Sequence, residues 1–373
     1  MDFSFTDEQQ ELGGLARRIL EDKVTEPVLR EVDAAGVRFD KGTWQALADA
    51  GLLGIGLPVE LGGGGYGIVE QCVVLEQVGR TVAPVPVAAS TVLGALPIAQ
   101  FGSDGLRQRW VTAAADGSAI LTAAYAEPAN RYPEQPATTA SPDGVGWRLT
   151  GVKTCVPAGS IADAFVVPAT APEGPALFLV ERGASGLTVE AQATTDRDAY
   201  GHLVLDGVAV PGDAVIGSVA DGREIVAWSF ERATIARCAE MLGVLARALE
   251  MTGDYTKQRV QFDRPIATFQ AVGHRLADCY IDIEGLRLTF WQAMWLLEEG
   301  RPAATEVEVA KYWAAEAAHR VGHAVVHVHG GTGIDEDYPL HRYFVAAKAL
   351  EFALGGATDQ LLRIGAAFAR AQT

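Results

Sequence analysis

The chain has 373 residues, 49% of them hydrophobic, so it is long enough to bury a large core in two or three domains. Its formal net charge of −17 argues against a nucleic-acid-binding protein, because such a protein needs a basic surface that displaces counterions from the phosphates. The same charge argues against docking on anionic lipid.

The cysteines and the lengths of the apolar runs indicate where in the cell the protein is expected. The four cysteines lie far apart and form no Cys-x-x-Cys pair, which predicts reduced, buried thiols. The N-terminal MDFSFTDEQQ shows no basic stretch followed by an apolar one, and no apolar run approaches the roughly 20 residues of a membrane span. We therefore expect a cytoplasmic protein that does not enter a membrane. The cysteines are Cys72, Cys155, Cys238 and Cys279.

Residues 1–117 are predicted to form a helical domain. Thr6 followed by Gln9 makes a capping box, and apolar residues then recur on one helix face. The stretch LGGGGYG at 61–67 lacks the Gly-Lys-Ser/Thr ending of a phosphate-binding loop, so we interpret it as a tight turn between helices. Further helices are expected at 43–54, 69–80 and 88–101.

Residues 118–221 are predicted to form an antiparallel β-domain of the sandwich or barrel type. Prolines, glycines and threonines become frequent, and short β-favouring runs appear, among them WRLTGVK, ALFLVER and HLVLDGVAV. Turn signals such as PDG and PEG separate these runs.

Residues 222–373 are predicted to be helical again. Long amphipathic segments with short links favour an antiparallel four-helix bundle. The chain is therefore expected to be an α+β protein with an N-terminal helical domain, a middle β-domain and a C-terminal bundle. The four long helices are expected at about 224–257, 266–299, 303–328 and 339–371.

Five of the seven histidines lie between His319 and His341. His319, His323 and His327 share one face of the predicted helix, and Glu316 supplies the Glu-x-x-His unit used by di-iron bundles. Such a site needs a second Glu-x-x-His from another helix, and the sequence contains none. We therefore favour packing histidines over a metal site.

Two stretches offer groups for a phosphate-bearing ligand. Gly330, Gly331 and Gly333 follow a long helix, and three glycines exceed what a helix C-cap needs. Without Cβ atoms the backbone can approach a ligand or a second chain, although a plain turn also explains the pattern. Between two long helices, Arg259 can offer a bidentate fork to a phosphate and Gln270 can bind a polar ligand, or both belong to a solvated loop.

Two blocks carry a resemblance to a known family. RVQFDRPIATFQAVGHRLAD (259–278) and HGGTGIDEDYPLHRYF (329–344), with the helix–β–helix layout, resemble the acyl-CoA dehydrogenases. Smaller matches such as LDGVAVPGDAVIG extend the resemblance over essentially the whole chain. It implies an FAD enzyme that takes an acyl-CoA substrate and passes electrons to electron-transfer flavoprotein or a similar acceptor. In that family a carboxylate removes the α-proton, the β-hydride passes to the flavin, and two subunits build each site.

The chain departs from the family where the flavin ring binds. The Trp and Thr that usually contact the ring correspond to Cys155 and Pro157, and proline lacks a backbone N–H. The segment AEPANRYPEQ also lacks the usual Gly-Ser-Asp. The resemblance therefore implies that this chain's own ring-binding segment is eroded.

The catalytic base is also displaced. The usual glutamate corresponds to Leu354, and its alternative location in some members corresponds to Ala233. Glu351 and Glu231 lie three and two residues away. A two-residue offset turns a helical side chain by about 200°, so Glu231 is a poor substitute, and Glu351 is a weak candidate. No catalytic residue is assigned in this chain.

The groups that family members donate to the FAD of a neighbouring subunit are retained. Arg259 corresponds to the arginine at the pyrophosphate, and Gly330 and Gly331 to the glycine pair at the adenosine half. His327 replaces a glutamine and can still donate one hydrogen bond. The predicted cofactor-binding residues are Arg259, Phe262, Gln270, His327, Gly330 and Gly331.

One retained half-site beside one lost half-site resembles the non-catalytic subunit of two-plus-two heterotetrameric acyl-CoA dehydrogenases, which act on steroid side-chain CoA thioesters. The resemblance thus implies a homologous partner subunit whose FAD site this chain completes. Three alternatives stay open: a self-sufficient homotetramer, a structural or binding paralogue without redox chemistry, and a di-metal bundle oxidase.

Overall fold

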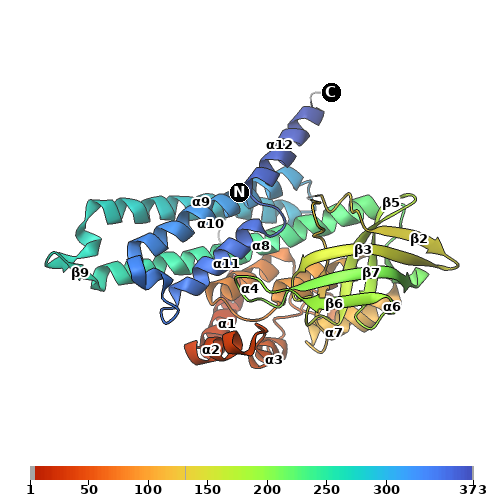
Figure 1. Cartoon of the computed structure of the whole chain (residues 1–373), viewed down its shortest axis with the longest axis horizontal. Coiled ribbons are helices and arrows are strands. Elements are labelled where there is room, and N and C mark those ends of the chain that lie inside the picture. Colours follow the sequence, from red (N-terminus) through yellow and green to blue (C-terminus); the bar gives the residue numbers. More distant parts are fainter. Residues whose placement is uncertain (1–4, 131, 372–373) are drawn as a thin grey trace. The chain divides into compact units, whose positions relative to one another are not determined.

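The computed structural model describes residues 5–130 and 132–371 (Figure 1). Its contacts divide the chain into two compact units, which we call the sheet unit and the bundle unit. The predicted domain limits at 117 and 221 stay a prediction, because the sheet unit contains residues from both sides of each limit. The sheet unit comprises Pro27–Gln71 and Pro84–Ala233, and the bundle unit comprises Met1–Glu26, Cys72–Ala83 and Thr234–Thr373.

One eight-stranded sheet forms the core of the sheet unit. Its order is β6-β7-β3-β2-β4-β5-β8, and β1 pairs with β4 in parallel. Successive strands joined by short turns pair antiparallel, as predicted. β4 and β5 are buried along almost their whole length, which fits their apolar sequences AFVVPATA and GPALFLVE. The strands are β1 (Leu121–Ala123), β2 (Thr139–Asp143), β3 (Gly146–Val156), β4 (Ala164–Ala171), β5 (Gly174–Glu181), β6 (Leu187–Ala191), β7 (Gly201–Val210) and β8 (Val215–Ile216).

Short helices precede β1 in the sequence, and a further one, η4, lies between β7 and β8. The stretch LGGGGYG forms the predicted turn between η1 and α4. A Cβ on Gly63 would lie 2.1 Å from the carbonyl oxygen of Leu57, so that position has room only for glycine. The helices are α2 (Glu26–Ala35), α3 (Lys41–Asp49), η1 (Val59–Leu61), α4 (Ile68–Arg80), η2 (Ala88–Ala95), α5 (Leu96–Phe101), α6 (Asp104–Leu106), η3 (Arg107–Val111), α7 (Thr112–Ala115) and η4 (Gly212–Ala214).

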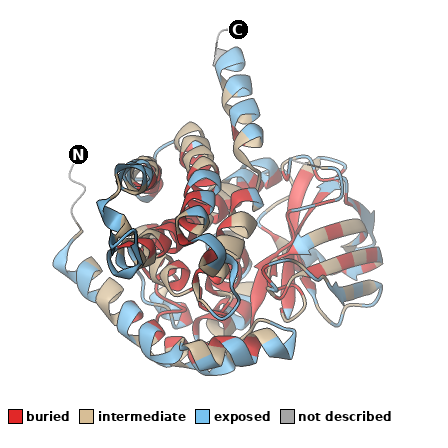
Figure 2. Ribbon diagram, turned by 60° about the vertical axis from the view of Figure 1, so that its left-hand side comes forward, coloured by how far each residue is buried: buried red, intermediate tan, exposed pale blue. Residues whose placement is uncertain are grey.

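Long helices form the bundle unit, which confirms the predicted α+β fold class. α10 packs against α9, α11 and α12, and buried residues concentrate in the bundle helices and the strands (Figure 2). Among the described residues, no helix has both the length and the apolar character that crossing a membrane requires. The elements are α1 (Asp7–Lys23), α8 (Gly222–Gln258), β9 (Val260–Gln261), β10 (Arg264–Pro265), η5 (Ile266–Thr268), α9 (Gln270–Glu298), α10 (Ala304–His329), η6 (Gly330–Ile334), α11 (Leu340–Phe352) and α12 (Ala357–Ala371).

The last predicted helix is wrong in one respect, because the chain breaks it into α11 and α12. Leu354 and Gly355 have φ angles of +58° and +100°, which no right-handed helix contains. The ammonium of Lys311 is buried and donates to the carbonyl oxygens of Leu350 and Glu351 at 2.9 and 3.0 Å. A buried cation thus satisfies the last carbonyls of α11, where continued helix would otherwise satisfy them.

Two glycines let α4 and α8 touch along their backbones within the bundle unit. A Cβ on Gly79 would lie 2.0 Å from the carbonyl oxygen of Glu240. A Cβ on Gly243 would lie 1.9 Å from the carbonyl oxygen of Glu76. The contact is therefore reciprocal, and neither helix can carry a side chain there. Further along the two helices, the guanidinium of Arg80 pairs with Glu250 of α8.

Replacing Gly79 by alanine should lower the stability of the protein, although alanine is ordinarily the better helix former. The added methyl group meets backbone atoms that cannot rotate away, and overpacking of this kind costs about 1–3 kcal/mol or more. Gly253 in helix α8 would meet nothing within 4 Å if it carried a Cβ. The matched variant Gly253→Ala should therefore gain up to about 1 kcal/mol. Calorimetric melting of both variants checks this, and an unchanged Tm for Gly79→Ala would contradict the contact.

Candidate functional site

Two of the predicted residues belong to a hairpin that follows α8: Arg259 stands just before its first strand, and Phe262 lies in its two-residue turn. β9 and β10 pair antiparallel across Phe262 and Asp263, whose φ angles are +54° and +62°. A turn of this type needs positive φ at both central residues and normally uses Asn and Gly. Phe262 adopts it nonetheless, and its side chain is 86% exposed. An exposed aromatic on a strained turn is a feature typical of a contact site.

The hairpin is tied to the helices around it. The backbone N–H of Arg259 donates to the carbonyl of Tyr255 at 2.8 Å, and that of Ile266 donates to the carbonyl of Arg259 at 2.8 Å. The rings of Phe262 and Phe269 meet edge to face at a centroid distance of 6.2 Å. The place of the exposed ring is therefore set by backbone hydrogen bonds and by packing at its base.

Exposed arginines gather at this end of the bundle unit. Arg259, Arg264 and Arg275 are all exposed, and none of them forms a salt bridge with any residue that the structure describes. The guanidinium of Arg264 lies over the Phe269 ring at 4.1 Å. Because these three guanidiniums have no carboxylate partner, their N–H donors offer a surface suited to an anion.

His327 adds a hydrogen-bond donor to this surface. Its Nδ1 lies 3.0 Å from Nη2 of Arg275, which connects α10 to α9. Because a guanidinium can only donate, Nδ1 must accept, and the neutral ring then carries its proton on Nε2. Gln270 begins α9 and is also exposed.

The glycine turn lies at the end of α10. Gly330 has φ +63° and ψ −139°, a conformation reserved for glycine. Both Gly330 and Gly331 are exposed, and a Cβ on either would meet nothing within 4 Å. The pair therefore offers bare backbone with room beside it. The ring of His329 stacks on Tyr255 at 4.2 Å, which holds the glycine turn and the hairpin at the same end of the bundle unit.

The segment expected at the flavin ring lies at the end of β3, in the sheet unit. Cys155 was predicted to be buried with the other cysteines, and this is wrong, because it lies in β3 at the register shift between Lys153 and Val156, where its φ of +47° accompanies an exposed side chain. Its N–H donates to Oε1 of Gln192 at 2.8 Å. The carbonyl of Pro157 accepts from Oγ1 of Thr122 at 2.6 Å, and proline has no N–H to offer.

A buried ion pair anchors the neighbouring AEP segment. Lys153 and Glu127 have almost no exposed side-chain surface, and their Nζ and Oε1 atoms lie 2.8 Å apart. Oε1 also accepts from the hydroxyl and the N–H of Thr138, and Nζ donates to the carbonyl of Pro168. Burial opposes ionisation of Glu127, but the ammonium of Lys153 and these hydrogen bonds outweigh it and lower its pKa to about 2.

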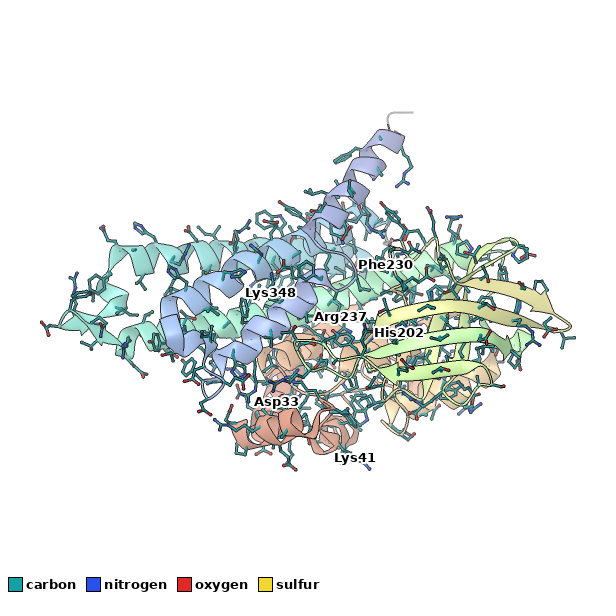
Figure 3. The ribbon with its side chains drawn as sticks, in the orientation of Figure 1. Asp33, Lys41, His202, Phe230, Arg237 and Lys348 are labelled. Atoms are coloured by element: carbon teal, nitrogen blue, oxygen red, sulfur yellow. The ribbon has the colours of Figure 1, made fainter. Side chains whose placement is uncertain are left out.

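The structure places the candidate bases in different surroundings. Leu354 and Ala233 bring no carboxylate. Glu351 is 8% exposed, and its carboxylate lies 2.6 Å from Nζ of Lys348, the residue labelled on α11 in Figure 3, and 3.6 Å from Nδ1 of His319. Glu231 in α8 is half-buried, and burial raises its pKa, an effect that the nearby Arg232 only partly opposes.

The remaining histidines do not converge. His319 and His323 are exposed, and their rings meet at 4.8 Å, while His323 also meets Phe344 at 5.3 Å. Burial and neighbouring positive charge lower the pKa of His323. Within the described part of the chain, no group of three or more His, Cys, Asp or Glu side chains is placed to hold a metal ion.

Comparison with known proteins identifies the family. Residues 6–118 match the model for the acyl-CoA dehydrogenase N-terminal domain, and residues 220–369 match that for the acyl-CoA dehydrogenase C-terminal domain. Acyl-CoA dehydrogenase FadE27 of Mycobacterium tuberculosis is 48% identical over 373 residues, which covers 98% of each chain. The chain belongs to the acyl-CoA dehydrogenase family. This confirms the predicted resemblance, and with it a flavoprotein oxidoreductase that acts on CH–CH bonds and uses FAD.

Two solved structures are similar over almost the whole chain. The ChsE4–ChsE5 complex from Mycobacterium tuberculosis contains a chain that is 47% identical, with a TM-score of 0.94 and 99% of both chains covered. A variant of the Tcur3481–Tcur3483 steroid ACAD contains a chain that is 44% identical, with a TM-score of 0.93, and the match covers 98% of this chain and 99% of the other.

The two candidate half-sites fit FAD unequally. At the bundle end, exposed guanidiniums, an imidazole N–H and bare glycine backbone suit a diphosphate. In the sheet unit, the Cys155 N–H is already bonded and Pro157 has none, so this segment lacks the donors that a flavin ring needs. Sequence reasoning missed Arg275, because a single arginine on a helix surface gives no signal until its contact with His327 is seen.

Replacing Glu127 by glutamine should destabilise the sheet unit strongly. The ammonium of Lys153 would stay buried without its counter-charge, which typically costs about 3–5 kcal/mol. The double variant Glu127→Gln/Lys153→Met should lose less than the single one, because no charge is left buried. Because the folded state depresses the Glu127 pKa, the wild-type contribution is full above about pH 4.5 and is lost as the pH falls towards about 2.

Urea unfolding of the wild-type protein and both variants at pH 7 measures these differences. A single variant as stable as the wild type, or a double variant less stable than the single one, would show that the ion pair does not anchor this segment.

Proposed function

We propose that this chain is the subunit of a hetero-oligomeric acyl-CoA dehydrogenase that completes the FAD site of a homologous catalytic partner. The observation that carries the proposal is the contrast between its two half-sites. The bundle end presents Arg259, His327 and the glycine pair to solvent. The ring-side positions are occupied by Cys155 and Pro157.

The exposed groups of the bundle end suit the diphosphate and adenosine parts of FAD. The guanidinium of Arg259 can donate two parallel hydrogen bonds to phosphate oxygens. The Nε2–H of His327 and the amide of Gln270 can donate to further oxygens, and the Phe262 ring offers an apolar face. Gly330 and Gly331 allow close approach of a bulky ligand. Bound FAD supplies hydride acceptance, whereas these side chains bind and orient it.

The catalytic step needs a carboxylate that this chain does not place at the usual positions. Leu354 stands in the turn between α11 and α12, and the nearby Glu351 is held by Lys348 at 2.6 Å. Its oxygens are thus already engaged by side chains of this chain. The proposal therefore assigns the base to the partner chain.

Exposed apolar residues support association with another subunit. On α12, Leu361, Leu362 and Phe368 are each more than half exposed, and α9 exposes Tyr280 and Ile281 to a similar extent. Clusters of this kind on a soluble domain usually contact a protein partner. The similar ChsE4–ChsE5 and Tcur3481–Tcur3483 structures are each described by two protein names.

The same proposal covers the substrate and the acceptor. We expect an acyl-CoA thioester as substrate, with a steroid side-chain CoA as the first class to test, because one of the two similar structures is described as a steroid ACAD. Electron-transfer flavoprotein or a similar acceptor would reoxidise the flavin, and we expect the enzyme in the cytoplasm.

Purifying the chain alone and with its co-expressed partner tests the division of labour. We expect the lone chain to hold little FAD and to reduce none with acyl-CoA, and the complex to hold fewer flavins than chains. Flavin absorbance after denaturation, set against protein concentration, gives the stoichiometry. A lone chain with one FAD that acyl-CoA bleaches would refute the proposal, and a complex with no flavin would favour a structural paralogue.

Replacing Arg259 by glutamine should weaken FAD binding to the complex about ten- to hundredfold, because a charge-assisted hydrogen bond to phosphate is worth about 1.5–3 kcal/mol. The matched control is Arg148→Gln, because Arg148 is exposed but pairs with Asp143 at 2.6 Å in the β2–β3 hairpin. Fluorescence titration with FAD measures both. Equal affinity of the two variants would remove Arg259 from the site.

One observation favours a second candidate function, a self-sufficient homo-oligomeric dehydrogenase. Glu231 is half-buried and has a raised pKa, as a general base needs. If it were the base, Glu231→Gln would lower kcat about 10²–10⁴-fold. We expect instead that the complex keeps its kcat within about twofold, because the base then lies in the partner. Steady-state assays of the variant complex with the active acyl-CoA decide between the two.

A further inference from the structure

His329, the last residue of α10, connects three segments at the candidate FAD surface. Its side chain is almost fully buried, at 3% exposure. The ring stacks on Tyr255 of α8, with centroids 4.2 Å apart and planes inclined by 25°. It also lies 5.2 Å from the ring of Tyr338, in the turn before α11.

Hydrogen bonds fix the tautomer of this ring. Nδ1 lies 2.8 Å from the carbonyl oxygen of Val325, and because a carbonyl only accepts, Nδ1 must carry the hydrogen. In the neutral ring Nε2 is then an acceptor, and the hydroxyl of Tyr338 lies 3.2 Å from it as the donor. The hydroxyl of Tyr255 donates to the backbone carbonyl of His329 at 3.4 Å.

The same contacts reach the candidate FAD-binding residues. The carbonyl of Tyr255 accepts from the N–H of Arg259 at 2.8 Å. The tyrosine that stacks on His329 is therefore bonded through its backbone to the start of the hairpin that carries Arg259. Gly330 follows His329 directly in the chain. A Cβ on Gly333 would lie 3.0 Å from the Cβ of His329, so the glycine turn folds back over this residue. A displaced ring would therefore move both the hairpin and the glycine turn.

We propose that His329 is a positioning residue that holds the Gly330–Gly331 turn and the Arg259 hairpin in register for the FAD diphosphate, and that it does so as a neutral imidazole. This inference rests on the proposed function. Protonation would convert Nε2 into a donor, which could no longer accept from the Tyr338 hydroxyl. The bond between the end of α10 and the turn before α11 would have to reverse, with the Tyr338 hydroxyl oxygen accepting, and a positive charge would be placed on a residue that is 3% exposed. Protonation therefore strains the contact that holds the turn in register.

Burial acts in the direction that the proposal requires. It lowers the pKa of His329, and the hydrogen bond to Val325 opposes this only in part. A histidine with a depressed folded-state pKa contributes fully above its ordinary pKa of about 6.5 and loses that contribution as the pH falls below it. The titratable groups that face His329 are Tyr255 of α8 and Tyr338 of the turn. Arg247 and Asp254 of α8 act on Tyr338, and Nδ1 of His341 on α11 lies 2.8 Å from the carbonyl of Tyr338.

The decisive variant is His329→Phe, which keeps an aromatic ring for Tyr255 but removes both nitrogens. Tyr338→Phe removes only the hydroxyl that Nε2 accepts from, so it tests the same hydrogen bond with little risk to folding. His202→Phe is the control, because this half-buried histidine lies on β7 in the sheet unit (Figure 3). Each variant is made in the co-expressed complex.

Two measurements are made on each complex between pH 5.5 and 8. Amide hydrogen exchange of peptides covering residues 330–334 reports the glycine turn, and fluorescence titration reports the Kd for FAD. We expect faster exchange and about five- to tenfold weaker FAD binding at pH 7.5 for both site variants. The wild type should lose FAD affinity only as the pH approaches the lowered pKa of folded His329, which lies below the ordinary value of about 6.5, whereas His329→Phe should show a flatter profile.

Wild-type exchange and FAD affinity in both site variants would overturn the proposal, as would a pH profile of His329→Phe identical to that of the wild type. Faster exchange without weaker FAD binding would also overturn it. The Arg259→Gln variant then distinguishes a failure of the role of His329 from a failure of the proposed function. If that variant still weakens FAD binding, the proposed function stands and only the role of His329 falls.

Discussion

The direct backbone contact between α4 and α8 sets the position of the longest helix in the bundle unit. Gly79 and Gly243 remove the two side chains that would keep these helices apart. α8 has 37 residues, so at 1.5 Å per residue it forms a rod of about 55 Å. A crossing fixed at Gly243 therefore determines where Tyr255 and the Arg259 hairpin lie, more than three turns further along. The geometry of the end that carries the candidate FAD-binding residues therefore depends on a backbone contact at two glycines.

Charge is distributed in this chain in a way that suits a shared cofactor. Several arginines named above pair with carboxylates, as Arg80 does with Glu250. Arg259, Arg264 and Arg275 do not, within the described residues, although the chain as a whole is strongly acidic. Like-charged exposed groups repel one another, so their proximity is favourable chiefly when an anion lies among them. In the sheet unit, by contrast, the ammonium of Lys153 is buried, and it pairs with Glu127 and donates to the carbonyl of Pro168.

Much of the fold followed from local pattern, and the failures have identifiable physical causes. The capping box at Thr6 and Gln9 is present, because the residues that form it are close in sequence. The break at Leu354 was not predicted, since leucine is a good helix former and its left-handed conformation is imposed by tertiary contacts, among them the burial of Lys311 under the last carbonyls of α11. Exposure of Cys155 likewise depends on an irregularity in the pairing of β3 with β7 that only the folded sheet defines.

The residues of the candidate site also differ in how far the sequence alone could point to them. Arg259 and the glycine pair became candidates through the family resemblance of their sequence blocks, because on pattern alone a solvated loop and a plain turn explained them as well. The contributions of Arg275 and His329 could not be predicted, because each acts through a contact between helices that are about 50 or more residues apart in the chain. Contacts between distant helices leave no mark in the local sequence, so the residues that make them are found only in the folded structure.

The hairpin that presents Phe262 has a consequence for how the chain meets another molecule. Its unfavourable backbone conformation is already adopted in the folded subunit, and the hydrogen bonds at its base keep it there. The backbone that carries the ring is thus ordered before any encounter, and little backbone freedom remains to be lost when a second surface covers it. An exposed aromatic on an ordered turn would favour rapid binding of another molecule. On a chain without a binding partner, the same ring would promote aggregation.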